Sequence, residues 1–103
     1  MRMVKELKER NRTRRTTDVI RSMINMHRYH KARRKYEDAK NNDGNYRIAM
    51  KYNNIMYEML FREFQMMRNW EYDTQTCEDN LRNLLSEAHS LSVKINFHEV
   101  TAQ

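Results

Sequence analysis

The sequence predicts an all-α fold, a small three-helix up-down-up bundle with a basic N-terminal arm. Three observations support this prediction. The 103 residues include no Pro and one Gly, so little interrupts helix. Two groups of turn-forming residues, at 41–45 and 73–76, divide the chain into three long segments. Within each segment, apolar residues recur three and four positions apart, which is typical of amphipathic helices.

The chain is short enough for a single domain. We expect a basic arm at residues 1–17, a three-helix domain at 18–96 and a C-terminal tail at 97–103. Because the predicted connections are short, consecutive helices should be antiparallel neighbours.

The first helix is predicted at 18–40, with Thr17 or Asp18 as its N-cap. One helical face carries its apolar residues, which are Val19, Met23, Met26, Tyr29, Ala32, Tyr36 and Ala39. We favour an arm that is loosely attached to this helix. The alternative is one continuous helix from residue 3 to 40, roughly 55 Å long.

The second helix is predicted at 46–71, with Asn45 as its N-cap and Gly44 supplying a positive φ in the preceding turn. Its apolar face carries Ala49, Tyr52, Met56, Met59, Met66 and Trp70. Glu63 interrupts this face, and either pairs with Arg28 or Arg82 or faces solvent. Further apolar residues widen the face, so this helix should contact neighbours on more than one side.

The third helix is predicted at 77–95, capped by Thr76. Its apolar residues follow an unbroken spacing of four and three, which is typical of a coiled-coil or bundle helix. They are Cys77, Leu81, Leu84, Ala88, Leu91 and Ile95. This face could pack in the bundle or pair with a second copy in a homodimer.

The composition indicates a thin, deformable core. Leu, Ile, Val and Phe together number only 18 residues, whereas Met numbers nine. We therefore expect a marginal monomer, or one whose core is completed by a partner or by dimerisation. The single Cys77 allows no disulfide within the chain, which suits a reducing, intracellular compartment, and we predict a cytoplasmic location. No apolar run is long enough for a membrane span. Abundant Asn, Tyr and Met, with no Pro, would suit a protein encoded by a phage or by an AT-rich genome.

Charge is distributed very unevenly along the chain. The first 35 residues carry thirteen Lys/Arg against three Asp/Glu, and the remaining 68 carry seven against eleven. A basic end on a near-neutral body favours a polyanionic partner, either nucleic acid (DNA or RNA) or an acidic protein surface. The candidate nucleic-acid-binding residues are Lys8, Arg10, Arg12, Arg14, Arg15, Arg28, Lys31, Arg34 and Lys35.

Aromatic residues lie among the basic ones and also form a second cluster. Tyr29 and Tyr36 are seven residues apart, so they either join the core, which we favour, or stack on exposed bases. The second cluster predicts either a central helix buried on two sides, which we favour, or an adaptable surface for a partner protein. It comprises Met56, Met59, Phe61, Phe64, Met67 and Trp70.

The sequence offers no pattern of catalytic, metal-binding or cofactor-binding residues. His27 and His30 have a metal-compatible spacing, but no carboxylate or Cys lies near them in the sequence to complete a site. We expect Cys77 to be a buried structural thiol. The sequence therefore predicts a non-enzymatic nucleic-acid-binding accessory protein that contacts phosphates through the arm and first helix. The alternatives are a protein-binding regulator or inhibitor, such as a phage would encode, and a small structural subunit of a larger assembly.

Overall fold

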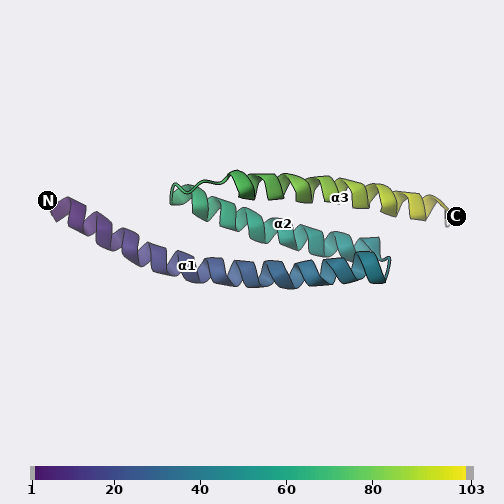
Figure 1. The fold of residues 1–103 in the computed structure, drawn as a ribbon, viewed down its shortest axis with the longest axis horizontal. Coiled ribbons are helices and arrows are strands. Elements are labelled where there is room, and N and C mark those ends of the chain that lie inside the picture. Colours follow the sequence, from purple (N-terminus) through teal and green to yellow (C-terminus); the bar gives the residue numbers. More distant parts are fainter. Residues whose placement is uncertain (1, 102–103) are drawn as a thin grey trace.

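The protein is an elongated bundle of three helices, 72 × 20 × 18 Å, with α2 lying between α1 and α3 (Figure 1). The computed structural model describes the backbone of residues 2–101 and the side chains of residues 16–99. Its elements are α1 (Arg2–Glu37), a short π-helical turn η1 (Asp38–Asn42), α2 (Tyr46–Asn69) and α3 (Gln75–Thr101). The described residues form no strand, and the predicted all-α up-down-up bundle is confirmed.

The connection between α1 and α2 matches the predicted turn chemistry. Gly44 has a φ of 59°, a left-handed value that glycine adopts without a steric penalty. The Asn45 side chain accepts a hydrogen bond from the backbone N–H of Ile48 at 3.2 Å, as an N-cap does. The predicted end of the first helix, near Lys40, falls inside η1.

At the connection between α2 and α3, the helix boundaries differ from the predicted ones by two residues on each side. Tyr72 donates its backbone N–H to Met67, and Glu71, with a φ of 57°, donates to Arg68, which closes α2 with a Schellman motif. The Asp73 side chain accepts from the backbone N–H of Gln75 at 3.0 Å. The capping oxygen therefore comes from Asp73 rather than Thr76, and α3 begins two residues earlier than predicted.

Both ends of the chain are more helical than predicted. The backbone of α1 is helical from Arg2 without a break at residue 18, as in the alternative of one long helix. Its first part projects beyond the end of α2 (Figure 1). The division into an arm and a domain, which concerns how independently residues 1–17 behave, stays a prediction. At the other end, α3 continues to Thr101, so residues 97–101 of the predicted tail are helical.

The core consists of two apolar clusters along α2. One contains Ala39, Ala49 and Leu91, and the other contains Leu60, Cys77 and Leu81. No described Cα of α1 lies within 8 Å of a Cα of α3, so these two helices meet only through side chains. The predicted apolar face of α3 is confirmed, because all six of its residues are buried or partly buried.

The inward face of α1 differs from the prediction in its first described turns. Val19 and Met23 are 52% and 68% exposed, although the spacing placed them on the inward face. The inward positions are instead taken by three polar residues, Asp18, Ser22 and Asn25. Two of these make hydrogen bonds to α2 or the residue that follows it, which explains why polar residues face inward there.

Candidate nucleic-acid interface

The basic residues predicted in the first helix lie on the outside of α1. Arg28, Lys31, Arg34 and Lys35 are all exposed. They belong to the segment 19–36, which carries six Lys/Arg and no Asp/Glu. The buried residues of the same segment, Asn25 and Ala32, mark the side of α1 that faces α2, and Arg28 and Lys35 flank that side.

Most of these cations are not neutralised by a neighbour. Arg33 pairs with Glu37 at 3.2 Å, and the Lys35 ammonium lies 5.4 Å from the centre of the Tyr52 ring. Within the described part of the chain, Arg28, Lys31 and Arg34 form no ion pair or side-chain hydrogen bond. Their charge is therefore available to a polyanion without a competing partner.

The two tyrosines of this segment belong to the bundle, as we favoured. Tyr29 packs against the cluster of Leu60, Cys77 and Leu81, and its ring meets His30 edge-on at 5.5 Å. Tyr36 packs against the other cluster. Both are partly buried, so the exposed face offers guanidinium and ammonium groups but no free tyrosine ring for stacking.

Five predicted residues, Lys8, Arg10, Arg12, Arg14 and Arg15, fall outside the residues whose side chains the structure describes. Their backbone belongs to α1.

The predicted partner surface of α2 is largely core. Met56 and Met59 are 2% and 6% exposed, which corrects their placement on a surface. Phe64 and Met67 are partly buried against the cluster of Leu60, Cys77 and Leu81. The physical reason is that α2 has neighbours on two sides, so most of its apolar residues are covered.

Two aromatic residues remain from that prediction. Trp70 is partly buried and donates its indole N–H to Asp18 at 2.5 Å. Phe61 is 40% exposed, and its ring lies nearly parallel to that of Tyr57 with 6.2 Å between ring centres. Little of the predicted cluster is therefore exposed for contact with a partner protein.

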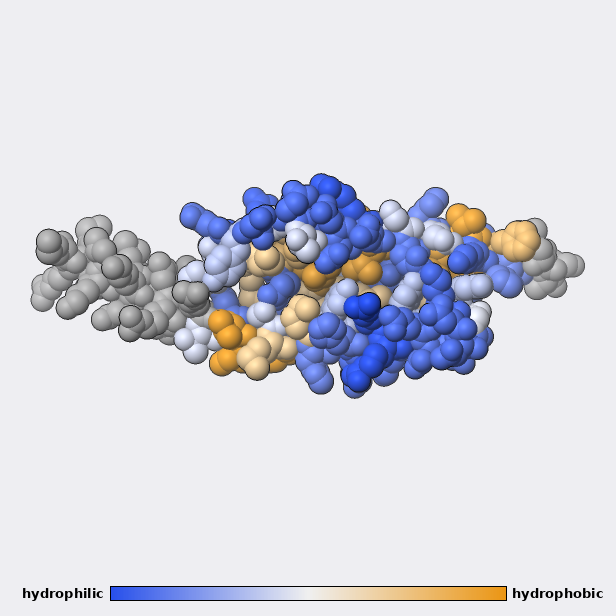
Figure 2. All heavy atoms as spheres, viewed as in Figure 1, coloured by the Kyte–Doolittle hydropathy of each residue, from blue (hydrophilic) through white to orange (hydrophobic). Residues whose placement is uncertain are grey.

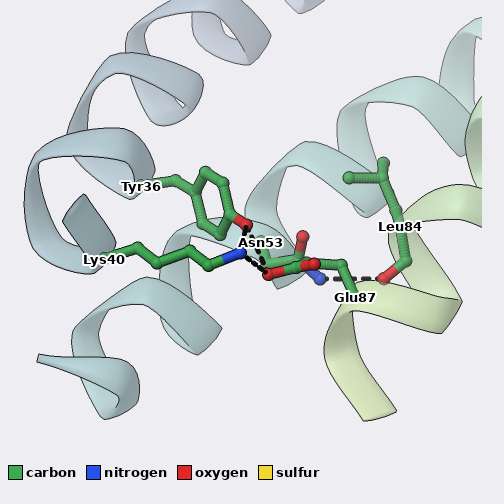
Figure 3. A network of polar contacts seen from close by, with 5 residues as sticks. All are labelled: Tyr36, Lys40, Asn53, Leu84 and Glu87. Atoms are coloured by element: carbon green, nitrogen blue, oxygen red, sulfur yellow. Dashed lines mark hydrogen bonds and ion pairs between the residues drawn. The ribbon is translucent and has the colours of Figure 1, made fainter. Parts of the chain in front are cut away.

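A polar network joins the end of α1 to α3 (Figure 3). Tyr36 donates its hydroxyl to the Glu87 carboxylate at 2.5 Å, and the Lys40 ammonium donates to the same oxygen at 2.6 Å. The hydrogen bond to Glu87 raises the pKa of Lys40, while burial followed by the bond to Glu87 raises the pKa of Tyr36. Burial raises the pKa of Glu87, whereas the hydrogen bonds from Lys40 and Tyr36 lower it. Together with the nearby positive charges, these bonds outweigh burial, so the pKa of Glu87 lies below its usual value.

No candidate metal site is present among the residues with described side chains. They contain no group of three His, Cys, Asp or Glu that could hold a metal ion, and His27 and His30 are both exposed. Cys77 is buried, and burial together with the charges of Glu63 and Glu78 raises its pKa, which suppresses the reactive thiolate. No described helix is long and apolar enough to cross a membrane.

A surface groove between α1 and α2 was not predicted from the sequence. It has a volume of about 450 Å³. Its lining combines three arginines, three amides and two apolar residues, which are Arg21, Ile24, Asn25, Arg28, Arg62, Gln65, Met66 and Asn69. Only Arg28 was a candidate site residue, because the others come from two segments about 40 residues apart and form no local motif.

Comparison of the chain with protein-family models, curated proteins and solved structures found no match. The chemistry of the interface is therefore the basis for the function proposed below.

Proposed function

We propose that the protein is a non-enzymatic nucleic-acid-binding accessory protein that contacts phosphates through α1. One observation carries the proposal. The segment 19–36 of α1 bears six Lys/Arg without an acid, and all four of the predicted binding residues within it are exposed. Guanidinium and ammonium groups along a helix are suited to phosphate oxygens, since each contact releases counterions from the nucleic acid.

The shape and charge of the chain support this proposal. A helix of 36 residues is about 54 Å long, enough to contact several successive phosphates. The rest of the chain, from residue 36 onward, carries more acids than bases. A polyanion should therefore approach α1 and be repelled by much of α2 and α3. Contacts of this kind fix position and supply affinity, with little readout of sequence.

The experiment is fluorescence-anisotropy binding to labelled single- and double-stranded DNA and RNA over roughly 50 to 300 mM salt. The test variant removes three charges from α1 through Lys31→Gln, Arg34→Gln and Lys35→Gln. The matched control removes three charges elsewhere through Lys51→Gln, Arg82→Gln and Lys94→Gln.

We expect the α1 variant to reduce the slope of log affinity against log salt by roughly 0.7–0.9 for each phosphate that it no longer binds. The control variant should keep nearly the full slope. Equal reductions in the two variants, or no binding by the intact chain at the lowest salt, would overturn the proposal. A chain lacking residues 1–16 measures the contribution of the predicted arm in the same assay.

The protein-binding alternative has weaker support. Of the six residues predicted for that surface, Met56 and Met59 are buried and only Phe61 is exposed. Binding to one acidic protein at moderate salt, without binding to nucleic acid, would favour this alternative.

A further inference from the structure

The residues that line the groove between α1 and α2 suit a ligand that has both a negatively charged part and an uncharged polar part. Arg21 and Arg28 come from α1 and Arg62 comes from α2, so two helices contribute positive charge to one recess. Because the helices are antiparallel, residues about 40 positions apart in the chain lie side by side there. The recess of about 450 Å³ falls within the usual range for small-ligand sites.

The guanidinium groups of the groove arginines form only weak ion pairs, or none, with residues of their own helices. Arg21 lies 4.0 Å from Asp18, and Arg62 bonds Glu58 at 2.7 Å across an exposed i,i+4 pair. Such exposed pairs contribute little to stability, so an anionic ligand could replace them. Arg28 has no ion-pair partner within the described residues. The groove thus offers three guanidinium groups that could turn to an anion at little cost.

The amide groups of the groove are a second feature that suits a ligand. Asn25 is only 7% exposed, yet its side chain makes no hydrogen bond within the described part of the chain. The amide atoms of Asn25 remain accessible to solvent in the groove, so its N–H and C=O groups can both bond a ligand there. Gln65 and Asn69 line the same recess and also form no side-chain hydrogen bond with described residues.

An amide both donates and accepts, as the edges of nucleic-acid bases do, whereas a phosphate only accepts. Ile24 and Met66 add apolar surface to the lining, against which the flat face of a base could pack. We propose that the groove binds one nucleotide of a single-stranded nucleic acid, with its phosphate on the arginines and its base on the amides. This inference rests on the function proposed above. It adds that the nucleic acid is single-stranded and that the groove binds one of its nucleotides.

The recessed position of the amides is what favours a single strand. In a duplex the bases are stacked and their pairing edges are occupied. A base that enters a recess between two packed helices must be unpaired and turned out from its neighbours. Asn25 lines this recess and is 7% exposed, so a base turned out of its stack can approach it more closely than a base held within a duplex.

The first arm of the test compares two single-charge variants in the anisotropy assay. Arg62→Gln removes a groove arginine, and Arg82→Gln removes an arginine of α3 that is also exposed and paired within its own helix. We expect Arg62→Gln to weaken binding to a single strand about tenfold, the effect of losing a charged hydrogen-bonding partner. Arg82→Gln should change it less than twofold. Binding to duplex should respond equally to both variants.

The second arm follows the groove directly by NMR of the methionine methyl groups in the intact chain. Met66 lines the groove, whereas Met23 lies exposed on another side of α1. A single-stranded tetranucleotide should shift the Met66 signal and leave that of Met23 nearly unchanged. Gln65→Ala, at an exposed position, should weaken this response. Polyphosphate of similar charge should shift Met66 much less, because it has no base.

The outcomes separate the two proposals. If the chain binds nucleic acid but Arg62→Gln and Arg82→Gln behave alike, or Met66 does not respond, the groove proposal is overturned and the phosphate-binding face of α1 stands. An equal Met66 response to polyphosphate would overturn the role of the base. If no nucleic acid binds at low salt, both proposals fail together.

Discussion

The two described halves of α1 present different kinds of side chain to the rest of the bundle. From Tyr29 onward, the inward positions are apolar and continue into η1, and Ala32 of α1 and Ala39 of η1 are 4% and 3% exposed. From Asp18 to Asn25 the inward positions are polar, while the apolar residues lie outside. Those exposed apolar residues are Val19, Ile20, Met23 and Ile24. Figure 2 shows the result as an apolar patch on the first described turns of α1, with a hydrophilic surface along much of the rest of the helix.

This difference indicates that the two halves are held by different forces. The second half buries apolar area in close contact with α2, an interaction that needs no specific partner atom. The first half depends on individual hydrogen bonds, such as the one from Ser22 to Glu63 at 2.5 Å. A directed bond is lost completely when either partner changes. The proposed nucleotide groove lies beside this polar half, where an unpartnered Asn25 leaves bonding capacity for a ligand.

The largest effect should come from the apolar cluster that holds the second half. Leu91 is fully buried against Ala39 and Ala49, so Leu91→Ala should lower the free energy of unfolding by about 2–5 kcal/mol. Leu85→Ala is the matched control, because Leu85 lies on the same helix but is 55% exposed. Urea unfolding followed by circular dichroism measures both. Similar decreases in the two variants would mean that this cluster is not the main anchor.

The next effect should come from the polar half. Ser22 is the only described partner of the Glu63 carboxylate, whose second oxygen is buried without a hydrogen bond. Ser22→Ala should therefore lower the free energy of unfolding by about 1–3 kcal/mol, since it leaves the partly buried Glu63 side chain without its hydrogen-bond partner. The double variant Ser22→Ala/Glu63→Met should recover most of that stability. A double variant no more stable than Ser22→Ala alone would argue against directed hydrogen bonding as the basis of this half.

A smaller, pH-dependent effect should come from the network that fastens the second half to α3. The pKa of Glu87 is lowered from 4.5, so its contribution is present above that pH and is lost as pH falls through the lowered value. The pKa values of Lys40 and Tyr36 are raised from 10.5 and 10.0, so their contributions are present below those values and are lost as pH rises through the raised ones.

Replacing Glu87 tests the acidic side of this behaviour. Glu87→Gln should lower the free energy of unfolding by roughly 0.5–1.5 kcal/mol at pH 7. The difference from the unaltered chain should be smaller at pH 3, because the contribution of the carboxylate is lost as pH falls through its lowered pKa. Urea titrations at the two pH values measure this. A difference of the same size at both pH values would show that the charge of Glu87 is not responsible.

The smallest effect should come from the outward apolar patch. Met23→Gln should change the free energy of unfolding by no more than about 0.5 kcal/mol, because Met23 is 68% exposed. The change should not depend on protein concentration. A larger decrease that grows with protein concentration would show instead that a second copy covers this patch, and would revise the comparison between the two halves.

The sequence by itself determined that the chain forms three helices and approximately where the two turns between them lie. A chain without Pro leaves few places to end a helix, and the local chemistry of Gly44 and Asn45 marks one of them. The regular apolar spacing of α3 likewise predicted its buried face, since a helix with one such face packs only one way. The exposed basic residues of α1 were also predictable, because charged side chains at these positions have no inward alternative.

Only the tertiary structure decided which side of α1 faces α2 in its first described turns. The sequence allowed an apolar face that includes Val19 and Met23, whereas the structure places Asp18 and Ser22 inward, where Trp70 and Glu63 supply hydrogen bonds. The groove depended on the same choice, since it forms where two antiparallel helices bring distant residues together. The spacing of apolar residues shows which face of a single helix is apolar. It cannot show that a polar residue will face inward, because that depends on a hydrogen-bond partner that another helix supplies when the helices pack.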